Sequence, residues 1–242
     1  MVVGRFAPSP TGPLHLGSLV AALGSWVFVR RAGGRWLVRM EDLDTPRVVA
    51  GAAERILETL RRYGLQWDGE VVHQSQRTAL YERALEVLKE KELVYDCGCS
   101  RAELCECRNG MPAGRVARAV RFRASNEVIE FHDLLRGRYA ERVDDFIVKR
   151  ADGIFAYQLA VVVDDADQAI TQVVRGEDLL ESTPRQIALQ RALGLPTPEY
   201  AHVPLALNPD GRKMSKREGA VPLDPDRVQE TLEEAYEILG FR

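Results

Sequence analysis

The sequence lacks the features that mark membrane and secreted proteins. No apolar run approaches the roughly 18 residues that a membrane-spanning helix needs, and the N-terminal residues do not form a charged leader followed by an apolar core. Internal repeats and low-complexity segments are also missing. We therefore expect a cytoplasmic protein without a membrane partner, and we expect it to be a monomer. The net charge of −3 argues against a protein that coats nucleic acid non-specifically, although it leaves room for a local basic face.

Cysteine is scarce, and the 4 cysteines of the chain are confined to one short segment. In a chain with no secretion signal, a paired cluster is more typical of metal ligands than of disulfides. The array would supply four thiolates to a structural, tetrahedral Zn²⁺ site, from Cys97, Cys99, Cys105 and Cys107. Buried free thiols are the alternative.

The chain does contain enough apolar residues for a core, together with a regular alternation of strand and helix patterns. Its 242 residues, 45% of them hydrophobic, suit one domain with an insertion or two small domains. Strands are predicted at Val2–Phe6 and Arg35–Met40, with a helix at Leu14–Arg31 between them. Further helices are predicted at Ala50–Tyr63, Thr78–Glu90 and Thr183–Leu193, and further strands at Val71–Val72, Phe155–Asp165 and Ile170–Val174. This order predicts an α/β protein with a doubly wound parallel sheet.

The alternation is interrupted after the first cysteine. Short alternating segments at Val116–Phe122 and Val128–Phe131 predict a small β-rich insertion that carries the zinc site. We therefore divide the chain into a first catalytic half (1–96), the insertion (97–148), a second catalytic half (149–205) and a C-terminal segment with a loop and a helix (206–242).

Two motifs near opposite ends of the chain point to nucleotide chemistry. The first runs from Arg5 to Ser18 and places a Pro/Gly-rich loop before a helix, whose free N–H groups and positive dipole end suit phosphates. His15 at the start of that helix could donate to a phosphate oxygen as charge develops, although a lone histidine is more often a capping or packing residue. The second motif contains Lys213 and Lys216 on a polar loop that offers positive charge to a triphosphate.

These motifs resemble the signatures of class I aminoacyl-tRNA synthetases. His15-Leu16-Gly17-Ser18 is similar to the HIGH signature, and Lys213-Met214-Ser215-Lys216-Arg217 is similar to the KMSKS signature. The stretches that surround them resemble the glutamyl-tRNA synthetase catalytic core over nearly the whole chain, namely Arg5 to Gly12, Arg39 to Asp44 and Val174 to Asp178. The resemblance implies a Rossmann-type sheet and the activation of glutamate with ATP.

Two departures narrow the resemblance to one branch of that family. The chain shows no large helical anticodon-binding region after Arg217, and the run Ser18 to Ser25 replaces the Gly-Ala-Arg-Thr-like continuation of the HIGH helix. Both features resemble truncated paralogues of glutamyl-tRNA synthetase. The resemblance implies that glutamate is transferred to the queuosine base in the anticodon of tRNA(Asp), so that ATP, L-glutamate and this tRNA are the expected partners.

The chemistry of glutamate sets what its pocket needs. Two carboxylates and an ammonium call for arginine forks and an acid. The resemblance places the following residues in the amino-acid pocket: Arg5, Ala7, Ser9, Glu41, Tyr157 and Arg175. Glu41 is expected to meet the α-ammonium, and which arginine takes which carboxylate stays open. A structural ion pair is the alternative for each residue, and Asp42 and Asp44 are expected to be structural.

For ATP, we expect contacts from Pro8, His15, Gly17, Ser18 and Lys216, with Mg²⁺ accompanying the triphosphate. His15, Lys213 and Lys216 are expected to act in catalysis by stabilising charge, and no covalent intermediate with the enzyme is required. The cysteine array departs from the Cys-x-Cys plus later Tyr and Cys pattern of some relatives. Cys97 and Cys99 are therefore firmer ligand predictions than Cys105 and Cys107.

Two other functions fit the same motifs. The chain could be the catalytic fragment of an ordinary glutamyl-tRNA synthetase that charges tRNA(Glu), or an inactive paralogue that binds tRNA or glutamate. The Ser18 to Ser25 run and the closing Leu239-Gly240-Phe241-Arg242 argue against the fragment. The presence of His15, both motif lysines and the acidic and basic pocket residues argues against the inactive paralogue.

Overall fold

The computed structural model describes residues 1–99, 106–207 and 221–241. Its helices are α1 (Leu16–Arg31), α2 (Ala52–Arg62), α3 (Thr78–Glu90), α4 (Tyr157–Asp167), α5 (Thr183–Leu193) and α6 (Val228–Leu239). Its strands are β1 (Val3–Phe6), β2 (Arg35–Met40), β3 (Val72–His73), β4 (Val94–Cys97), β5 (Ala119–Phe122), β6 (Val128–Asp133), β7 (Gly137–Arg142), β8 (Phe146–Lys149), β9 (Gln172–Gly176) and β10 (Glu199–Val203). None of the helices in these ranges is both long and apolar enough to pass through a membrane.

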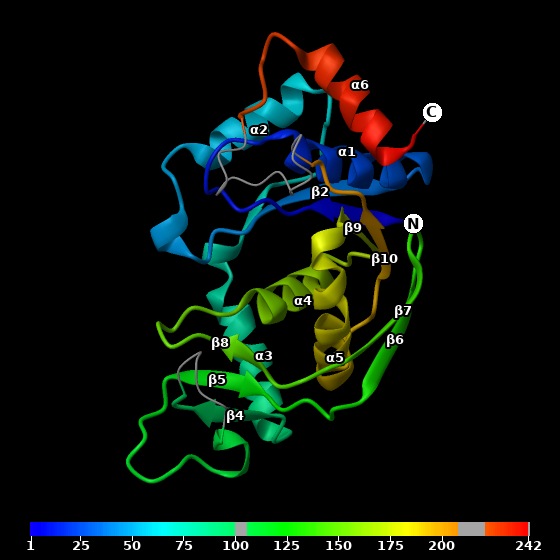
Figure 1. Cartoon of the computed structure of the whole chain (residues 1–242). Helices are drawn as coiled ribbons and strands as arrows, with labels where there is room; N and C mark the ends of the chain where they lie inside the picture. The colour runs from blue at the N-terminus through cyan, green and yellow to red at the C-terminus, as the bar shows by residue number, and fades with distance from the viewer. Residues whose placement is uncertain (100–105, 208–220, 242) are drawn as a thin grey trace.

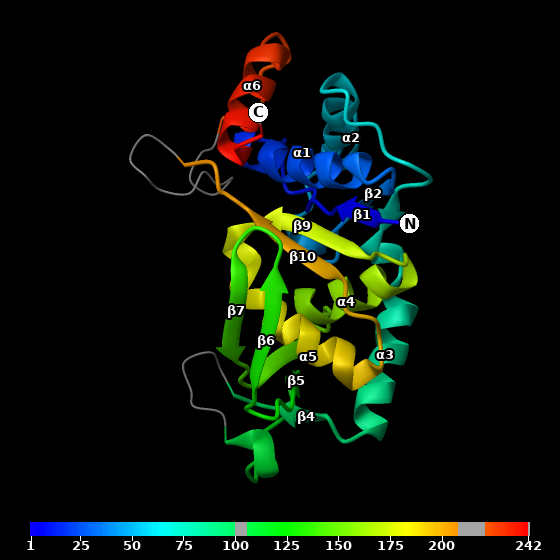
Figure 2. The ribbon, with the colours of Figure 1, turned by 90° about the vertical axis from the view of Figure 1, so that its right-hand side faces the viewer.

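A central parallel sheet organises the chain. β2 pairs in parallel with β1 and β3, and β10 pairs in parallel with β9 and β6. The two groups of strands meet where β1 and β9 lie side by side, and the amide of Thr171 donates to the carbonyl of Val3 at 2.9 Å (Figure 2). The strands lie in the order β3-β2-β1-β9-β10. From β1 the chain adds strands outward on one side, and from β9 it adds them outward on the other side, so the boundary between β1 and β9 is the topological switch point of a doubly wound fold.

Helices cover both faces of this sheet and bury a separate core on each. Figure 1 shows α1, α2 and α6 on one side and α3, α4 and α5 on the other. The first core joins α1 to the sheet and to α6, and the second joins α4 and α5 to the opposite face. A Cβ at Gly4 would lie 2.4 Å from Val29 Cγ2, so glycine is what allows α1 to pack this close to β1.

The predicted α/β class is confirmed, but one element was given the wrong type. The run Phe155–Asp165, expected as a strand, is mostly the helix α4, and Tyr157 is its first residue. Every residue from Leu159 to Asp165 is buried, so the run has no exposed polar face and its periodicity cannot distinguish a buried helix from a buried strand. The strand β10 was not predicted.

The segment predicted as an insertion is rich in β structure, and it supplies strands to two sheets. β4, β5 and β8 form an antiparallel sheet that carries the first cysteines. The antiparallel hairpin of β6 and β7 instead extends the central sheet, because Tyr200 of β10 pairs with Asp133 at the end of β6. The turn of this hairpin therefore lies next to the second half of the catalytic fold.

Candidate active site

A pocket of about 670 Å³ lies at the switch point, where β1 and β9 end. This is where open α/β sheets bind their ligands. The structure brings ten of the predicted site residues to its walls, namely Arg5, Ala7, Pro8, Ser9, His15, Gly17, Ser18, Glu41, Tyr157 and Arg175. Sequence reasoning missed several others that line the pocket, including Arg47, Asp178 and Leu205. Lys213 and Lys216 lie outside the described residues.

The loop between β1 and α1 is held to the rest of the fold by its backbone. The amide of Glu41 donates to the carbonyl of Pro8 at 2.9 Å, and the amide of Val49 donates to Pro10 at 3.0 Å. His15 is the N-cap residue of α1, and Ser18 Oγ accepts from the His15 amide at 2.7 Å. The structure therefore gives His15 and Ser18 a capping function in addition to a place in the pocket wall.

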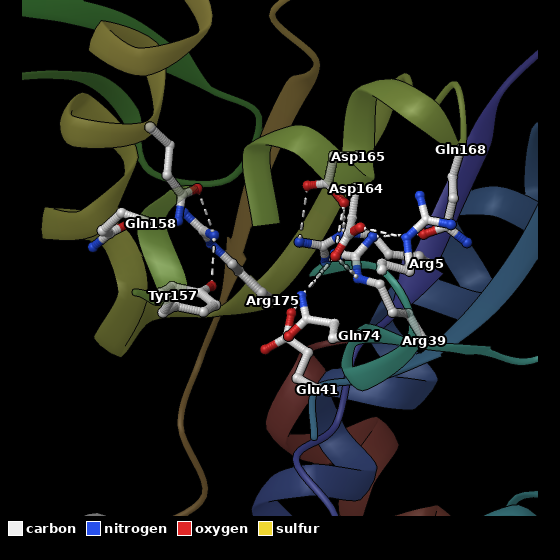
Figure 3. A network of polar contacts seen from close by, with 12 residues as sticks. Arg5, Arg39, Glu41, Gln74, Tyr157, Gln158, Asp164, Asp165, Gln168 and Arg175 are labelled. Atoms are coloured by element: carbon white, nitrogen blue, oxygen red, sulfur yellow. Dashed lines mark hydrogen bonds and ion pairs between the residues drawn. The ribbon is translucent and has the colours of Figure 1, made fainter. Parts of the chain in front are cut away.

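On the β1 side of the pocket, arginines and acids form a buried ion cluster (Figure 3). Asp165 accepts from Arg5 Nε at 3.1 Å and from Arg39 Nη2 at 2.8 Å. Arg39 Nε also lies 3.7 Å from Asp164, and Asp164 accepts from Arg77 at 2.7 Å. Burial alone would raise the pKa of Asp165, but the two guanidinium groups outweigh it and lower that pKa.

Glu41 belongs to this cluster but is not fully paired. Its Oε1 is buried without a hydrogen-bond partner among the described residues and lies 3.6 Å from Arg39 Nη2. Burial raises the pKa of Glu41 to about 7, against the opposing effect of Arg39 and Arg5. A buried carboxylate oxygen in this state gains from a cationic donor brought by a ligand.

On the β9 side, Arg175 is surrounded differently. Its guanidinium donates to His202 Nε2 at 3.2 Å, Tyr157 Oη at 3.2 Å, Gln186 Oε1 at 2.9 Å and Thr183 Oγ1 at 2.8 Å. A longer contact of 3.4 Å reaches the carbonyl of Leu179. Within the described part of the chain, every one of these partners is neutral. Arg175 is 5% exposed, so its charge faces the pocket with little solvent screening.

Asp42 and Asp44, the acids that follow β2, hold the loop after this strand to neighbouring segments. Asp42 accepts from the amide of Ser75 at 2.8 Å, and Asp44 pairs with Arg150 at 2.9 Å. Arg39 is held by Asp165 instead, which sequence reasoning did not identify. The available signal was the pair Asp164-Asp165 at the end of an apolar run, because buried acids need cationic partners.

Three cysteines form a separate cluster at the C-terminal end of β4, a strand that lies at the end of the molecule opposite α6 (Figures 1 and 2). The sulfur atoms of Cys97, Cys99 and Cys107 all lie within 4.8 Å of one another, and Cys97 and Cys107 are buried. Thiolates that share a tetrahedral zinc at about 2.3 Å lie about 3.8 Å apart, so this donor set fits a metal ion. Cys107 therefore belongs to the same cluster as Cys97 and Cys99, which were the firmer ligand predictions. Cys105 is outside the described residues.

Comparison with known proteins places this chain in one family. The family model described as "tRNA synthetases class I (E and Q), catalytic domain" matches residues 1–119 and 115–232. A glutamate tRNA ligase from Elizabethkingia meningosepticum, solved in complex with its amino acid, has 32% identity and a TM-score of 0.77 over 90% of this chain. The chain spans 52% of that ligase. A Mycobacterium tuberculosis methionyl-tRNA synthetase, 13% identical with a TM-score of 0.65 over 98% of this chain and 62% of its own, shares the fold.

The curated relatives narrow the family further. Glutamyl-Q tRNA(Asp) synthetase of Thiobacillus denitrificans is 57% identical over 98% of this chain and 85% of the relative. The protein of the same name from Geobacter sulfurreducens is 54% identical over 93% of this chain and 79% of the relative. The chain therefore belongs to the class I tRNA synthetases for E and Q, within the branch of the glutamyl-Q tRNA(Asp) synthetases.

Proposed function

We propose that the protein activates L-glutamate with ATP and transfers it to the queuosine base in the anticodon of tRNA(Asp). The observation that carries this proposal is the 57% identity to a glutamyl-Q tRNA(Asp) synthetase over 98% of the chain. The pocket at the switch point supports it, because acidic and basic groups of the kinds that glutamate requires face one cavity. A tRNA substrate implies that the protein acts in the cytoplasm.

In the amino-acid half of the pocket, we assign each charged group of glutamate to an opposite charge. Glu41 would accept from the α-ammonium, which supplies the donor that its buried Oε1 lacks. Arg5 and Arg175 would hold the carboxylates, and the Tyr157 hydroxyl beside Arg175 would complete that wall. Ala7 and Ser9 would line the floor between them.

In the nucleotide half, the start of α1 would meet the phosphates. Backbone N–H groups at a helix N-terminus attract anions, and Pro8, His15, Gly17 and Ser18 surround that position. The α-carboxylate of glutamate would attack the α-phosphate of ATP in line, which forms glutamyl-adenylate and releases pyrophosphate. His15, together with Lys213 and Lys216, would stabilise the charge that develops, and Mg²⁺ would enter with the triphosphate. A hydroxyl of the queuosine ring would then attack the carbonyl carbon of the adenylate, which forms the glutamyl ester, breaks the bond to the phosphate and releases AMP and the hydroxyl proton.

The deciding experiment is charging with labelled glutamate. The protein is incubated with ATP-Mg²⁺ and one of three RNAs, namely tRNA(Asp) with queuosine, tRNA(Asp) without it, and tRNA(Glu). We expect label only on the queuosine-containing tRNA(Asp). Label on tRNA(Glu), with none on the queuosine-containing RNA, would instead support a fragment of an ordinary glutamyl-tRNA synthetase.

A second assay separates an enzyme from an inactive paralogue. Glutamate-dependent exchange of labelled pyrophosphate into ATP reports the activation step alone, and we expect it with the wild-type chain. The assay is run with and without each tRNA, so that an activation step that requires bound RNA is also detected. No exchange under any of these conditions at saturating ATP-Mg²⁺ would exclude the catalytic proposal.

For the cysteine cluster, we propose structural zinc bound by Cys97, Cys99 and Cys107, with Cys105 as the predicted fourth ligand. Zinc closed in by four thiolates supplies folding free energy rather than chemistry. We expect one zinc per chain by elemental analysis and loss of that zinc in Cys107→Ser. Full zinc content in Cys107→Ser would remove this residue from the ligand set.

A further inference from the structure

Arg175 is linked to a buried acid through an imidazole. His202, on β10, accepts from Arg175 Nε at its Nε2 atom, 3.2 Å away. Its other ring nitrogen, Nδ1, lies 2.6 Å from Oδ2 of Asp133, which ends β6. His202 and Asp133 are both fully buried, and neither lines the pocket. The chain of contacts therefore runs from the β6–β7 hairpin to the pocket.

The partners of His202 fix where its proton lies. A guanidinium group can only donate hydrogen bonds, so Nε2 of His202 has to accept from Arg175. The single proton of a neutral imidazole then lies on Nδ1 and is donated to the Asp133 carboxylate. A proton on Nε2 would instead point at the Nε–H of Arg175 and would push this guanidinium out of position.

The surroundings of His202 keep the ring neutral. It faces Asp133 and Arg136 from the β6–β7 hairpin, Arg175 from β9, the hydroxyl of Thr183 at the start of α5, and the rings of Tyr200 and Phe131. Burial lowers the pKa of His202, and the charge of Arg175 acts in the same direction against the effect of Asp133. Two cations in contact would be unfavourable in this site.

We propose that Asp133 and His202 are positioning residues of the amino-acid pocket, which hold the Arg175 guanidinium in place by fixing the tautomer of His202. Neither residue lines the pocket, because His202 contacts Arg175 and Asp133 contacts His202. The expected effect on the KM for glutamate rests on the proposed function, in which Arg175 holds a carboxylate of glutamate. The tautomer itself is a property of the ligand-free protein.

The environment of Asp133 makes its charge testable with a near-isosteric change. Its Oδ1 accepts from the amides of Leu135, Arg136 and His202 at 3.0, 2.9 and 3.2 Å. In Asp133→Asn, the side-chain carbonyl would take this position, because only an oxygen can accept from three amides. The NH₂ group of the new side chain would then face Nδ1 of His202, which would have to accept and would transfer its proton to Nε2.

The first test is spectroscopic and needs no substrate. The chain has only 4 histidines, so ¹⁵N-histidine labelling gives a small set of ring signals, and His202→Gln identifies the one that belongs to position 202. We expect the Nδ1–H tautomer in the wild type and the Nε2–H tautomer in Asp133→Asn. An Nε2–H tautomer or a charged ring in the folded wild type at neutral pH would overturn the proposal.

The second test is kinetic and compares the two substrates. In pyrophosphate exchange, Asp133→Asn and His202→Ala should each raise the KM for glutamate about tenfold to a hundredfold, because a buried donor loses its acceptor. The KM for ATP should change less than threefold. The double variant should be no worse than His202→Ala alone, since both changes break the same chain of contacts. Full additivity of the two effects would contradict the proposal.

Tyr200→Phe is the matched control. It lies in the same core and loses a hydrogen bond from Gln190 at 2.9 Å, yet it keeps the ring that stacks on His202. Its KM for glutamate should stay within about threefold of the wild type at a similar loss of stability. If Asp133→Asn changes the KM for glutamate no more than Tyr200→Phe does, Asp133 and His202 have a structural role only, and the proposal fails. If no variant or wild-type protein exchanges pyrophosphate, the proposed function fails while the tautomer result still stands.

Discussion

Arg5 and Arg175 face the same pocket from neighbouring strands, and both are buried, but the protein balances their charges differently. Arg5 shares the Asp165 carboxylate with Arg39, at 3.1 and 2.8 Å. In the part of the chain that the structure describes, Arg175 donates only to neutral oxygens and to a neutral imidazole nitrogen. The nearest acid in that chain of contacts, Asp133, is separated from it by the whole His202 ring.

The different partners of Arg5 and Arg175 imply different contributions to folding stability and to ligand binding. An arginine whose charge is matched by a buried acid belongs to an ion cluster, and removing one partner leaves the others unpaired. An arginine with neutral partners keeps its charge available for an anionic ligand. We therefore expect changes on the Arg5 side to affect folding most, and changes on the Arg175 side to affect glutamate binding most.

The largest expected effect is on the Arg5 side. Asp165→Asn removes the carboxylate that, among the residues of the described ranges, pairs with both Arg5 and Arg39, and it leaves two buried cations without a full counter-charge. Breaking a buried pair in this way costs about 3–5 kcal/mol. We expect this decrease in the free energy of unfolding, measured by urea denaturation at neutral pH.

Asp167→Asn provides the control for that change. Asp167 is the next acid along α4, two residues after Asp165, and its side chain is 49% exposed while it pairs with Arg77. An exposed pair contributes about 0–1 kcal/mol, so this variant should unfold close to the wild type. Equal losses in the two variants would show that the buried cluster is not what stabilises this side of the pocket.

The next effect is on binding. Arg175→Met removes the charge that no described carboxylate balances, and the KM for glutamate should rise about a hundredfold or more. The decrease in unfolding free energy should be smaller than for Asp165→Asn, because no buried acid loses its direct partner. Arg5→Met should lower stability as well as binding. Pyrophosphate exchange and urea denaturation on the same preparations measure both quantities. A KM for glutamate in Arg175→Met within threefold of the wild type would contradict the assignment of Arg175 to glutamate binding.

Much of this arrangement could be predicted from the sequence where local pattern and ligand chemistry agree. The β1 strand, the helix that follows it and the β2 strand have clear periodicities, and parallel strands of one sheet place their carboxyl ends together. The resemblance to the glutamyl-tRNA synthetase core implied that Arg5, Glu41 and Arg175 share one pocket, and in the structure all three line the same cavity. Their individual functions remain proposals.

The parts that could not be predicted depend on contacts between distant segments. Asp165 and Arg5 are 160 positions apart in the sequence, and His202 and Asp133 are 69 positions apart. Neither contact can therefore be predicted from the spacing of residues within one helix or strand. The helix α4 was taken for a strand because burial on every side removes the alternation that distinguishes the two. The same error placed Tyr157 on a strand, although it begins a helix and still reaches Arg175.

The smallest expected effect is a pH dependence on the Arg5 side of the pocket. Burial raises the pKa of Glu41 from 4.5 to about 7, so this group is largely protonated at pH 6 and ionised at pH 8. Only the carboxylate attracts an α-ammonium, and the affinity for glutamate should therefore rise with pH until about pH 7.5. Below the pKa, affinity should fall about tenfold per pH unit.

Folding stability should follow the opposite sign. Between pH 4.5 and about 7 the folded state binds a proton at Glu41 that the unfolded chain has released, so this group makes the protein less stable as pH rises through that window. Glu41→Gln removes the titrating group, and it should flatten this contribution to stability while weakening glutamate binding at pH 8. Calorimetric titration of the wild type with glutamate at pH 6 should show proton release, because the ammonium displaces the bound proton. An affinity that stays constant from pH 6 to pH 8 would show that Glu41 is ionised throughout, and the pocket would then carry its negative charge before glutamate arrives.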